Sequence, residues 1–131
     1  MASNIKREFL PEEQFVINYK TSQIVDDMPH AISESYIPYS YFSGLYEKLN
    51  EKHVSLYAFF EKNGYKPTHK KEILRVDAPS IDERIHLNIV DANRVNVVRI
   101  QGYVYSGDIL VELCLLCDRS DLYEFHYEIT M

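Results

Sequence analysis

The sequence contains no tryptophan and only two cysteines, Cys114 and Cys117. They lie three positions apart in an apolar run typical of a buried strand, so their side chains are expected to point to opposite faces. No second cysteine pair is present to complete a zinc site. We therefore expect reduced, structural cysteines, and neither a metal nor a cofactor.

The chain also lacks a long apolar run and an excess of positive charge. No stretch approaches the roughly 20 apolar residues of a membrane span, and the polar first residues do not resemble a signal peptide. The formal net charge of −6 disfavours contact with a phosphate backbone. These absences predict a cytoplasmic protein that contacts neither membrane nor nucleic acid through this chain.

Signatures of catalysis are missing too. The histidines fit no recognisable triad or metal-ligand spacing, and no glycine-rich phosphate loop occurs. They are His30, His53, His69, His86 and His126. We therefore expect no enzyme.

The 131 residues suffice for one domain with its own core. We expect a single domain over 1–131, with residues 1–10 poorly ordered or the remnant of a missing element. The 11 tyrosines suit strand edges as well as a half-wet pocket.

Two strand–turn–strand units dominate the pattern. The first covers about 15–37, with a turn at 25–29 that contains two aspartates and Pro29. The second covers about 94–117. At an offset of 81 residues (108 minus 27), Asp27 falls on Asp108. The hairpins predict a pseudo-duplicated α+β fold, an antiparallel sheet with helices packed on one face.

Helical spacing predicts helices over 40–50 and 55–62 and a third that 79–83 opens. Further strands are expected over 71–77 and 122–129. Ser55 can cap the second helix, and Ser80 and Glu83 have the spacing of a capping box. In the third helix the expected core-facing residues are Ile81, Ile85 and either Leu87 or Ile89.

Three motifs resemble one family. Ser55-Leu56-Tyr57, with Gly64 closing the same helix, is similar to the central motif of UTRA domains, the ligand-binding domains of the HutC branch of GntR-type transcription regulators. Residues 27–38 resemble the first hairpin turn and the strand that follows it. Glu112, followed by residues 119–123, resembles the closing pattern. The resemblance runs from about residue 10 to the end.

The resemblance implies a chorismate-lyase-like fold and a homodimer that senses a sugar phosphate, a sugar or an organic acid. DNA would be bound only through a winged-helix domain that is not in this chain. The first strand and helix of the family domain are also expected to be missing. A stand-alone interaction and dimerisation module and a chorismate-lyase-like enzyme are the alternatives.

The resemblance also implies a ligand site. Carried over by position, its members are Ser55 and Tyr57 from the central motif and Tyr123 from the closing pattern. Arg119 and Asp121 are expected to pair with each other and stabilise the turn before the last strand.

On the first hairpin the family's two arginines fall on Thr21 and Gln23, and its glutamate falls on Ser33, with Glu34 as a neighbour on the other face. Neither Thr nor Gln offers the charged fork of Arg. Either the ligand is not the usual anion, or Lys20 supplies the charge from an altered register, or the site is degenerate.

Overall fold

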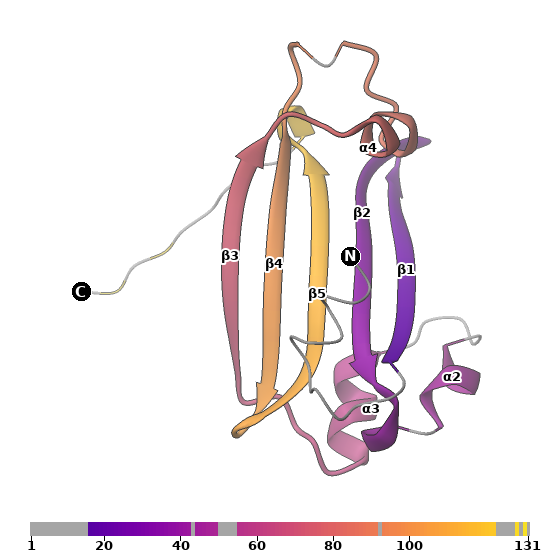
Figure 1. The fold of residues 1–131 in the computed structure, drawn as a ribbon, viewed down its shortest axis with the longest axis vertical. Coiled ribbons are helices and arrows are strands. Elements are labelled where there is room, and N and C mark those ends of the chain that lie inside the picture. Colours follow the sequence, from indigo (N-terminus) through magenta and orange to yellow (C-terminus); the bar gives the residue numbers. More distant parts are fainter. Residues whose placement is uncertain are drawn as a thin grey trace.

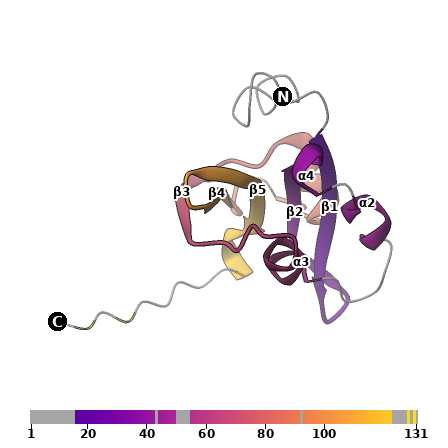
Figure 2. The same ribbon diagram turned by 90° about the horizontal axis from the view of Figure 1, so that it is seen from below.

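The computed structural model describes residues 16–42, 44–49, 55–91, 93–122, 128 and 130. Five antiparallel strands form one curved sheet in the order β1-β2-β5-β4-β3 (Figures 1 and 2). The strands are β1 (Val16–Val25), β2 (Met28–Pro38), β3 (His69–Asp77), β4 (Val97–Ser106) and β5 (Ile109–Arg119). The expected antiparallel α+β fold is confirmed, while the expectation for residues 1–10 lies outside the described residues.

The helices are short and lie near the two ends of the sheet (Figure 1). They are η1 (Tyr39–Tyr41), α2 (Leu45–Lys48), α3 (Leu56–Lys62), α4 (Ile81–His86) and η2 (Ser120–Leu122). Among the described residues, none of these helices is long and apolar enough to cross a membrane.

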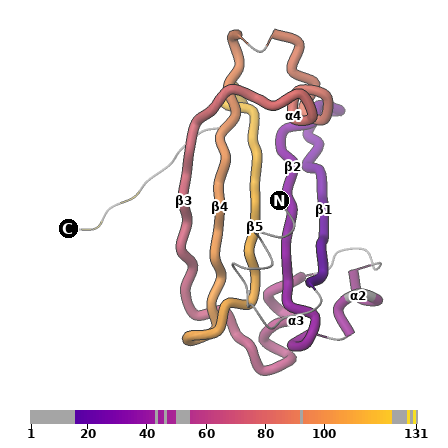
Figure 3. The backbone as a smooth tube through the Cα atoms, in the orientation of Figure 1, coloured from indigo at the N-terminus to yellow at the C-terminus, as the bar shows by residue number. Residues whose placement is uncertain are grey.

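The two hairpins, β1–β2 and β4–β5, whose courses can be followed in Figure 3, deviate from regular pairing at equivalent positions. The register shifts between Gln23 and Ile24 in the first and between Val104 and Tyr105 in the second. The offset is again 81 residues (104 minus 23). In both hairpins the extra residue is on the return strand, His30 in the first and Val111 in the second. A bulge at the same place in each hairpin supports the expected pseudo-duplication, because bulges set the local twist of a hairpin.

The turn of the first hairpin contains no glycine. Asp26 and Asp27 have φ angles of 51° and 61°, and a two-residue hairpin turn of type I′ requires positive φ at both positions. Aspartate tolerates this conformation because its short side chain can hydrogen-bond locally.

The sheet has two covered faces. On one, which we call the α3 face, Ile17, Ile37 and Val104 pack with Phe42 and Phe60. This arrangement places η1, α2 and α3 together, as the sequence pattern predicted.

On the opposite face, the α4 face, Leu87 and Ile89 follow α4 and pack against Ile32, Val97 and Cys117. Neighbouring residues of a strand point to opposite faces, and Ile32 pairs with Cys117 in register. The expected packing on one face therefore holds for α2 and α3, whereas α4 lies on the other.

Two local expectations were wrong. The helix expected over 40–50 is two short pieces, η1 and α2, because Phe42 is buried between them and Gly44 opens the second. Ile81 and Ile85 do not face the core: they are 74% and 70% exposed. Glu83, on the opposite side of the same short helix, takes the inward position through an ion pair with the sheet.

Several other expectations for the helices are confirmed. Ser55 caps α3, Ser80 and Glu83 form a capping box on α4, and Leu87 and Ile89 are buried. Of the strand expected over 122–129, Leu122 belongs to η2, and residues 123–127 and 129 lie outside the described residues.

Candidate functional site

A cavity of about 690 Å³ lies on the α4 face, within the size range of small-molecule sites. Two rows of register partners cross all five strands and line it. The first row is Ser22, Ile32, Cys117, Arg99 and Arg75. The second is Lys20, Glu34, Leu115, Gln101 and Ile73. Because the sheet is curved (Figure 2), the edge strands β1 and β3 both border the same cavity.

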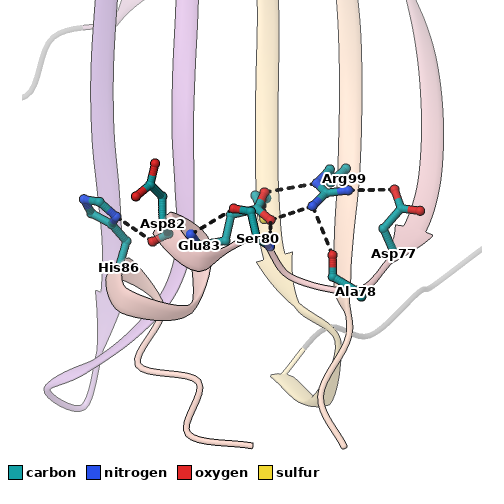
Figure 4. Close-up of polar contacts among 8 residues, drawn as sticks. Asp77, Ala78, Ser80, Asp82, Glu83, His86 and Arg99 are labelled. Carbon is teal, nitrogen blue, oxygen red and sulfur yellow. Dashed lines mark hydrogen bonds and ion pairs between the residues drawn. The ribbon is translucent and has the colours of Figure 1, made fainter. Parts of the chain in front are cut away.

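Arg99 lines the α4 end of the cavity, and Figure 4 shows its contacts with the neighbouring elements. Its Nε and Nη2 donate to the two carboxylate oxygens of Glu83 at 3.0 and 2.6 Å. Its Nη1 donates to Asp77 Oδ2 at 2.8 Å, and Nη2 also donates to the Ala78 carbonyl at 3.2 Å. One guanidinium therefore joins β4, the end of β3 and α4, and its charge is balanced inside the protein.

Glu83 is held from several sides. Its Oε1 accepts from the Ser80 amide at 2.8 Å, and its own amide donates to Ser80 Oγ at 3.1 Å. The hydrogen bonds from Arg99 lower the pKa of Glu83 to about 2. The Cys117 thiol donates to Oε2 at 3.2 Å, and burial together with this carboxylate raises the pKa of Cys117 to about 12. The carboxylate is ionised and the thiol neutral at ordinary pH.

Other charged groups on the cavity wall have no such partner. Lys20 on β1, Arg75 on β3 and Asp82 on α4 form no ion pair within 4.0 Å among the described residues. Glu34, the register partner of Lys20, accepts from Asn18 Nδ2 at 3.2 Å and from the Tyr36 hydroxyl. Positive and negative side chains without an ion-pair partner therefore line a cavity large enough for a small molecule.

α4 itself presents two more polar groups to the cavity. Asp82 and His86 both border it, and the His86 ring lies with Nδ1 2.7 Å from the Asp82 carbonyl oxygen. Figure 4 shows both side chains beyond the Arg99 network, towards β1 and β2. The α4 end of the cavity therefore carries carboxylates and hydrogen-bonding groups, and the edge strands β1 and β3 carry the basic residues Lys20 and Arg75.

Thr21 and Ser33 are register partners and both border this cavity. The other first-hairpin candidate, Gln23, pairs with Ala31 and does not line it. All three lie in the alternate set of strand positions, on the α3 face.

The predicted residues of the central motif are separate from the cavity. Ser55 Oγ accepts from the Ala58 amide at 3.4 Å and so caps α3. Tyr57 is half-exposed, and its pKa is raised by burial and by Glu112 on the α3 face. Tyr123 lies outside the described residues. The structure therefore brings Thr21 and Ser33 together as register partners, whereas Ser55 and Tyr57 do not line the cavity.

A polar cluster occupies the α3 face beside Tyr57. Glu112 is buried; burial raises its pKa, against a hydrogen bond with Ser35 and the charge of Lys70 that lower it. The Lys70 side chain lies across Gly102, where a Cβ would come within 2.7 Å of its Cε, and its Nζ pairs with Glu72 at 3.2 Å. The lysine fills the space above the glycine.

Sequence reasoning missed Arg99, Glu83 and Asp77. A signal was present in the apolar segment Val97-Val98-Arg99-Ile100, where one charge interrupts a strand and requires a partner. Lys20 and Glu34 are not among the missed residues: the alternative of an altered register is the one that places Lys20, with its register partner Glu34, beside the cavity.

The closing pattern holds the far end of α4. Arg119 donates to both carboxylate oxygens of Asp121 at 3.1 and 2.8 Å, as expected. Its Nη1 also donates to the carbonyls of Leu87 and Asn88 at 3.2 and 3.4 Å. A cation at these carbonyls stabilises a helix end, so this pair fixes the position of α4.

The cysteines match the expectation from their spacing. Cys114 pairs with Ser35 and Gly102, Cys117 with Ile32 and Arg99, so the two thiols lie on opposite faces. Both are free. Within the part of the chain that the structure describes, no group of three or more His, Cys, Asp or Glu residues could hold a metal ion.

Comparison with known proteins gives one family and one fold. Residues 6–124 match the UTRA domain. The effector domain of PhnF from Mycobacterium smegmatis is similar with a TM-score of 0.77 and 21% identity, over 88% of this chain and 70% of that one. A GntR-family transcriptional regulator from Enterococcus faecalis has the same TM-score and identity, over 98% and 91%. A structure of PhnF from Mycobacterium smegmatis has a TM-score of 0.76 and 21% identity, and the match covers 88% of this chain and 50% of that one. No curated protein matches the chain.

Proposed function

The chain belongs to the UTRA domain family, and from this premise we propose that it is the effector-binding and dimerisation domain of a bacterial GntR-type regulator of the HutC branch. A small molecule binds to the cavity on the α4 face. The bound state alters DNA binding by a winged-helix domain outside this chain, in the cytoplasm. The effector domain of PhnF, which shares the fold, supports the regulatory assignment over a catalytic one.

The cavity, with its unpaired charges, is the observation that carries this proposal. Lys20 and Arg75 stand on the two edge strands, and Asp82 lies at the closed end. All three side chains are exposed and have no ion-pair partner in the described part of the chain, so their charges are available to a polar ligand in the cavity. Thr21 and Ser33 border the same cavity and remain candidate contacts.

Lys20 supplies the positive charge that arginines supply in the family, because Thr21 and Gln23 occupy the arginine positions and are uncharged. It occupies the cavity side of β1, opposite Glu34 in register. A sugar phosphate or an organic acid would place its anionic group near Lys20 or Arg75. Its hydroxyl groups would reach Glu34, Asp82 or Gln101, which offer acceptors and an amide.

A thermal-shift screen tests the proposal. We expect at least one of glucosamine 6-phosphate, glucose and citrate to raise the melting temperature, because a ligand at 100 times its Kd adds about 2.7 kcal/mol of stability. Lys20→Met and Arg75→Gln should reduce the shift. Lys71→Met, on the same strand as Arg75 but outside the cavity lining, is the matched control and should leave it unchanged.

The same screen distinguishes the two candidate surfaces. Ser55→Ala and Tyr57→Phe should leave the shift intact if the ligand occupies the α4 face. A shift that is lost in these two variants and kept in Lys20→Met would move the site to the α3 face. No response to a broad panel of sugars, sugar phosphates and organic acids would count against effector binding.

A catalytic role is not part of the proposal. The similar solved proteins in the comparison are regulators and effector domains. Conversion of chorismate by the purified chain would contradict this assignment.

A further inference from the structure

The cavity on the α4 face is lined by charged residues of both signs. Three of them are basic and four are acidic. The basic residues are Lys20, Arg75 and Arg99, and the acidic residues are Glu34, Asp77, Asp82 and Glu83. With His86 neutral, the lining has a formal net charge of −1 (three minus four). A ligand that carries only negative charge would be repelled by this excess, so the lining favours a ligand that also carries a positive group.

Negative charge gathers at the α4 end of the cavity. Asp77, Asp82 and Glu83 lie there with Arg99, which forms ion pairs with Asp77 and Glu83 (Figure 4). Asp82 is exposed and has no ion-pair partner within 4.0 Å among the residues that the structure describes. A positively charged group of a ligand therefore finds an available carboxylate at Asp82.

His86 adds a hydrogen-bond acceptor beside Asp82. The two residues are four positions apart on α4 and are therefore neighbours on the same side of the helix, and both line the cavity. Nδ1 of His86 lies 2.7 Å from the Asp82 carbonyl oxygen. Because a carbonyl oxygen only accepts, Nδ1 carries the hydrogen, and Nε2 of the neutral ring is an acceptor. A carboxylate and an imidazole acceptor together suit an ammonium group, which has three donors and no acceptor.

Positive charge is available at Arg75 on the edge strand β3. Arg75 is the register partner of Arg99, and like charges directly opposite each other in a sheet are unfavourable. Arg99 is paired with carboxylates, whereas Arg75 is exposed and has no ion-pair partner within 4.0 Å in the described ranges. Lys20, on the other edge, has the opposite charge of Glu34 as its register partner. Arg75 is therefore the basic residue that an anionic group of a ligand would stabilise most.

We propose that the ligand of this cavity is a small zwitterion, whose ammonium group binds Asp82 and His86 on α4 and whose anionic group binds Arg75 on β3. This inference rests on the proposed function and names the chemical class of the effector. An amino acid whose amine and acid are separated by an aliphatic chain is the simplest member of that class. Its methylene groups would contact apolar residues that also line the cavity, such as Ile73 and Leu115.

Three matched compounds test the proposal: 6-aminohexanoate carries both charges, hexanoate lacks the amine, and hexylamine lacks the acid. We expect 6-aminohexanoate to raise the melting temperature of the wild-type chain most. Its Kd from titration calorimetry should be about tenfold lower than that of either single-charge compound, because the loss of a hydrogen bond to a charged group weakens binding by roughly that factor or more. β-Alanine and 4-aminobutyrate, included in the same series, measure which separation of the two charges fits the cavity.

Charge variants locate the two ends of the ligand. Asp82→Asn should raise the Kd of 6-aminohexanoate about tenfold without raising that of hexanoate, and Arg75→Gln should raise both. Glu61→Gln removes an exposed carboxylate from α3, outside the cavity lining, and is the matched control. Asp82→Lys should reverse the preference, so that adipate, with an acid at each end, binds more tightly than 6-aminohexanoate. Circular dichroism establishes that each variant is folded.

The outcomes separate this inference from the proposed function. Hexanoate that binds as tightly as 6-aminohexanoate, or a preference for the amine that survives Asp82→Asn, overturns the zwitterion site and leaves effector binding standing. The inference also fails if no amino acid of the series shifts the melting temperature while a sugar, a sugar phosphate or an organic acid does. No shift with any of these compounds counts against the inference and the proposed function together.

Discussion

Arg99 on β4 and Glu83 on α4 form a two-point ion pair, with Nε–Oε2 and Nη2–Oε1 distances of 3.0 and 2.6 Å (Figure 4). The pair attaches a helix of six residues, Ile81–His86, to the centre of the sheet. So short a helix is unstable alone. Its position, and with it the closed end of the cavity, depends on this contact and on the packing of Leu87 and Ile89.

The first prediction concerns acid stability. Arg99 lowers the pKa of Glu83 to about 2 from an ordinary value of 4.5, so the folded state favours the ionised carboxylate. This stabilisation is fully present above about pH 4.5 and is lost as the pH falls towards 2. Glu83→Gln should lower the free energy of unfolding by about 1.5–3 kcal/mol at pH 7 and flatten its pH dependence between 4.5 and 2.

Urea unfolding at a series of pH values measures this effect. Arg94→Gln is the control, because Arg94 and Asp91 form an exposed ion pair at 3.3 Å, and such pairs contribute about 0–1 kcal/mol. Equal losses in the two variants would show that the Arg99 network is an ordinary surface pair.

The strands could be predicted from sequence more closely than the site. Hairpins with Asp26-Asp27 and Gly107-Asp108 at their turns specify local pairing, and alternation then places the core side chains. The order in which hairpins join is set by long-range contacts such as Ser35 with Cys114, which leave little local signal.

Predicting the site required knowing which face of the sheet each side chain occupies. A shift of one residue in strand register moves every side chain to the other face. The family alignment placed Thr21 and Ser33 in the roles that geometry favours for Lys20 and Glu34. In α4, helical spacing predicted that Ile81 and Ile85 face the core. The ion pair of Glu83 instead places the opposite side of the helix against the sheet. Periodicity cannot foresee that a partly buried charge pair overrides an apolar stripe on a helix of six residues.

A second prediction concerns Asn88, which follows α4 with a φ of 54°. Asparagine tolerates the left-handed region and alanine does not, at a cost of about 1–2 kcal/mol. Asn88→Ala should therefore lower the free energy of unfolding by about 1 kcal/mol, and Asn88→Gly should be close to neutral. Chemical denaturation checks both. Asn93→Ala, in a nearby turn without positive φ, is the control, and the idea fails if it costs as much as Asn88→Ala.

A third prediction concerns the thiols. Burial and Glu83 raise the pKa of Cys117 to about 12 from 9.0, which reduces its thiolate fraction on the order of 1000-fold. Stability from the neutral thiol is complete below about pH 9 and is lost as the pH rises towards 12. Iodoacetamide at pH 8 should alkylate Cys117 far more slowly in the native than in the unfolded chain, as peptide mass spectrometry would show.

Glu83→Gln separates the causes of that protection. It removes the carboxylate that accepts from Cys117, so the native alkylation rate at Cys117 should rise. The rate at Cys114, whose pKa is raised by burial and by Glu112, should not change. A parallel increase at both thiols would indicate general loosening of the sheet instead.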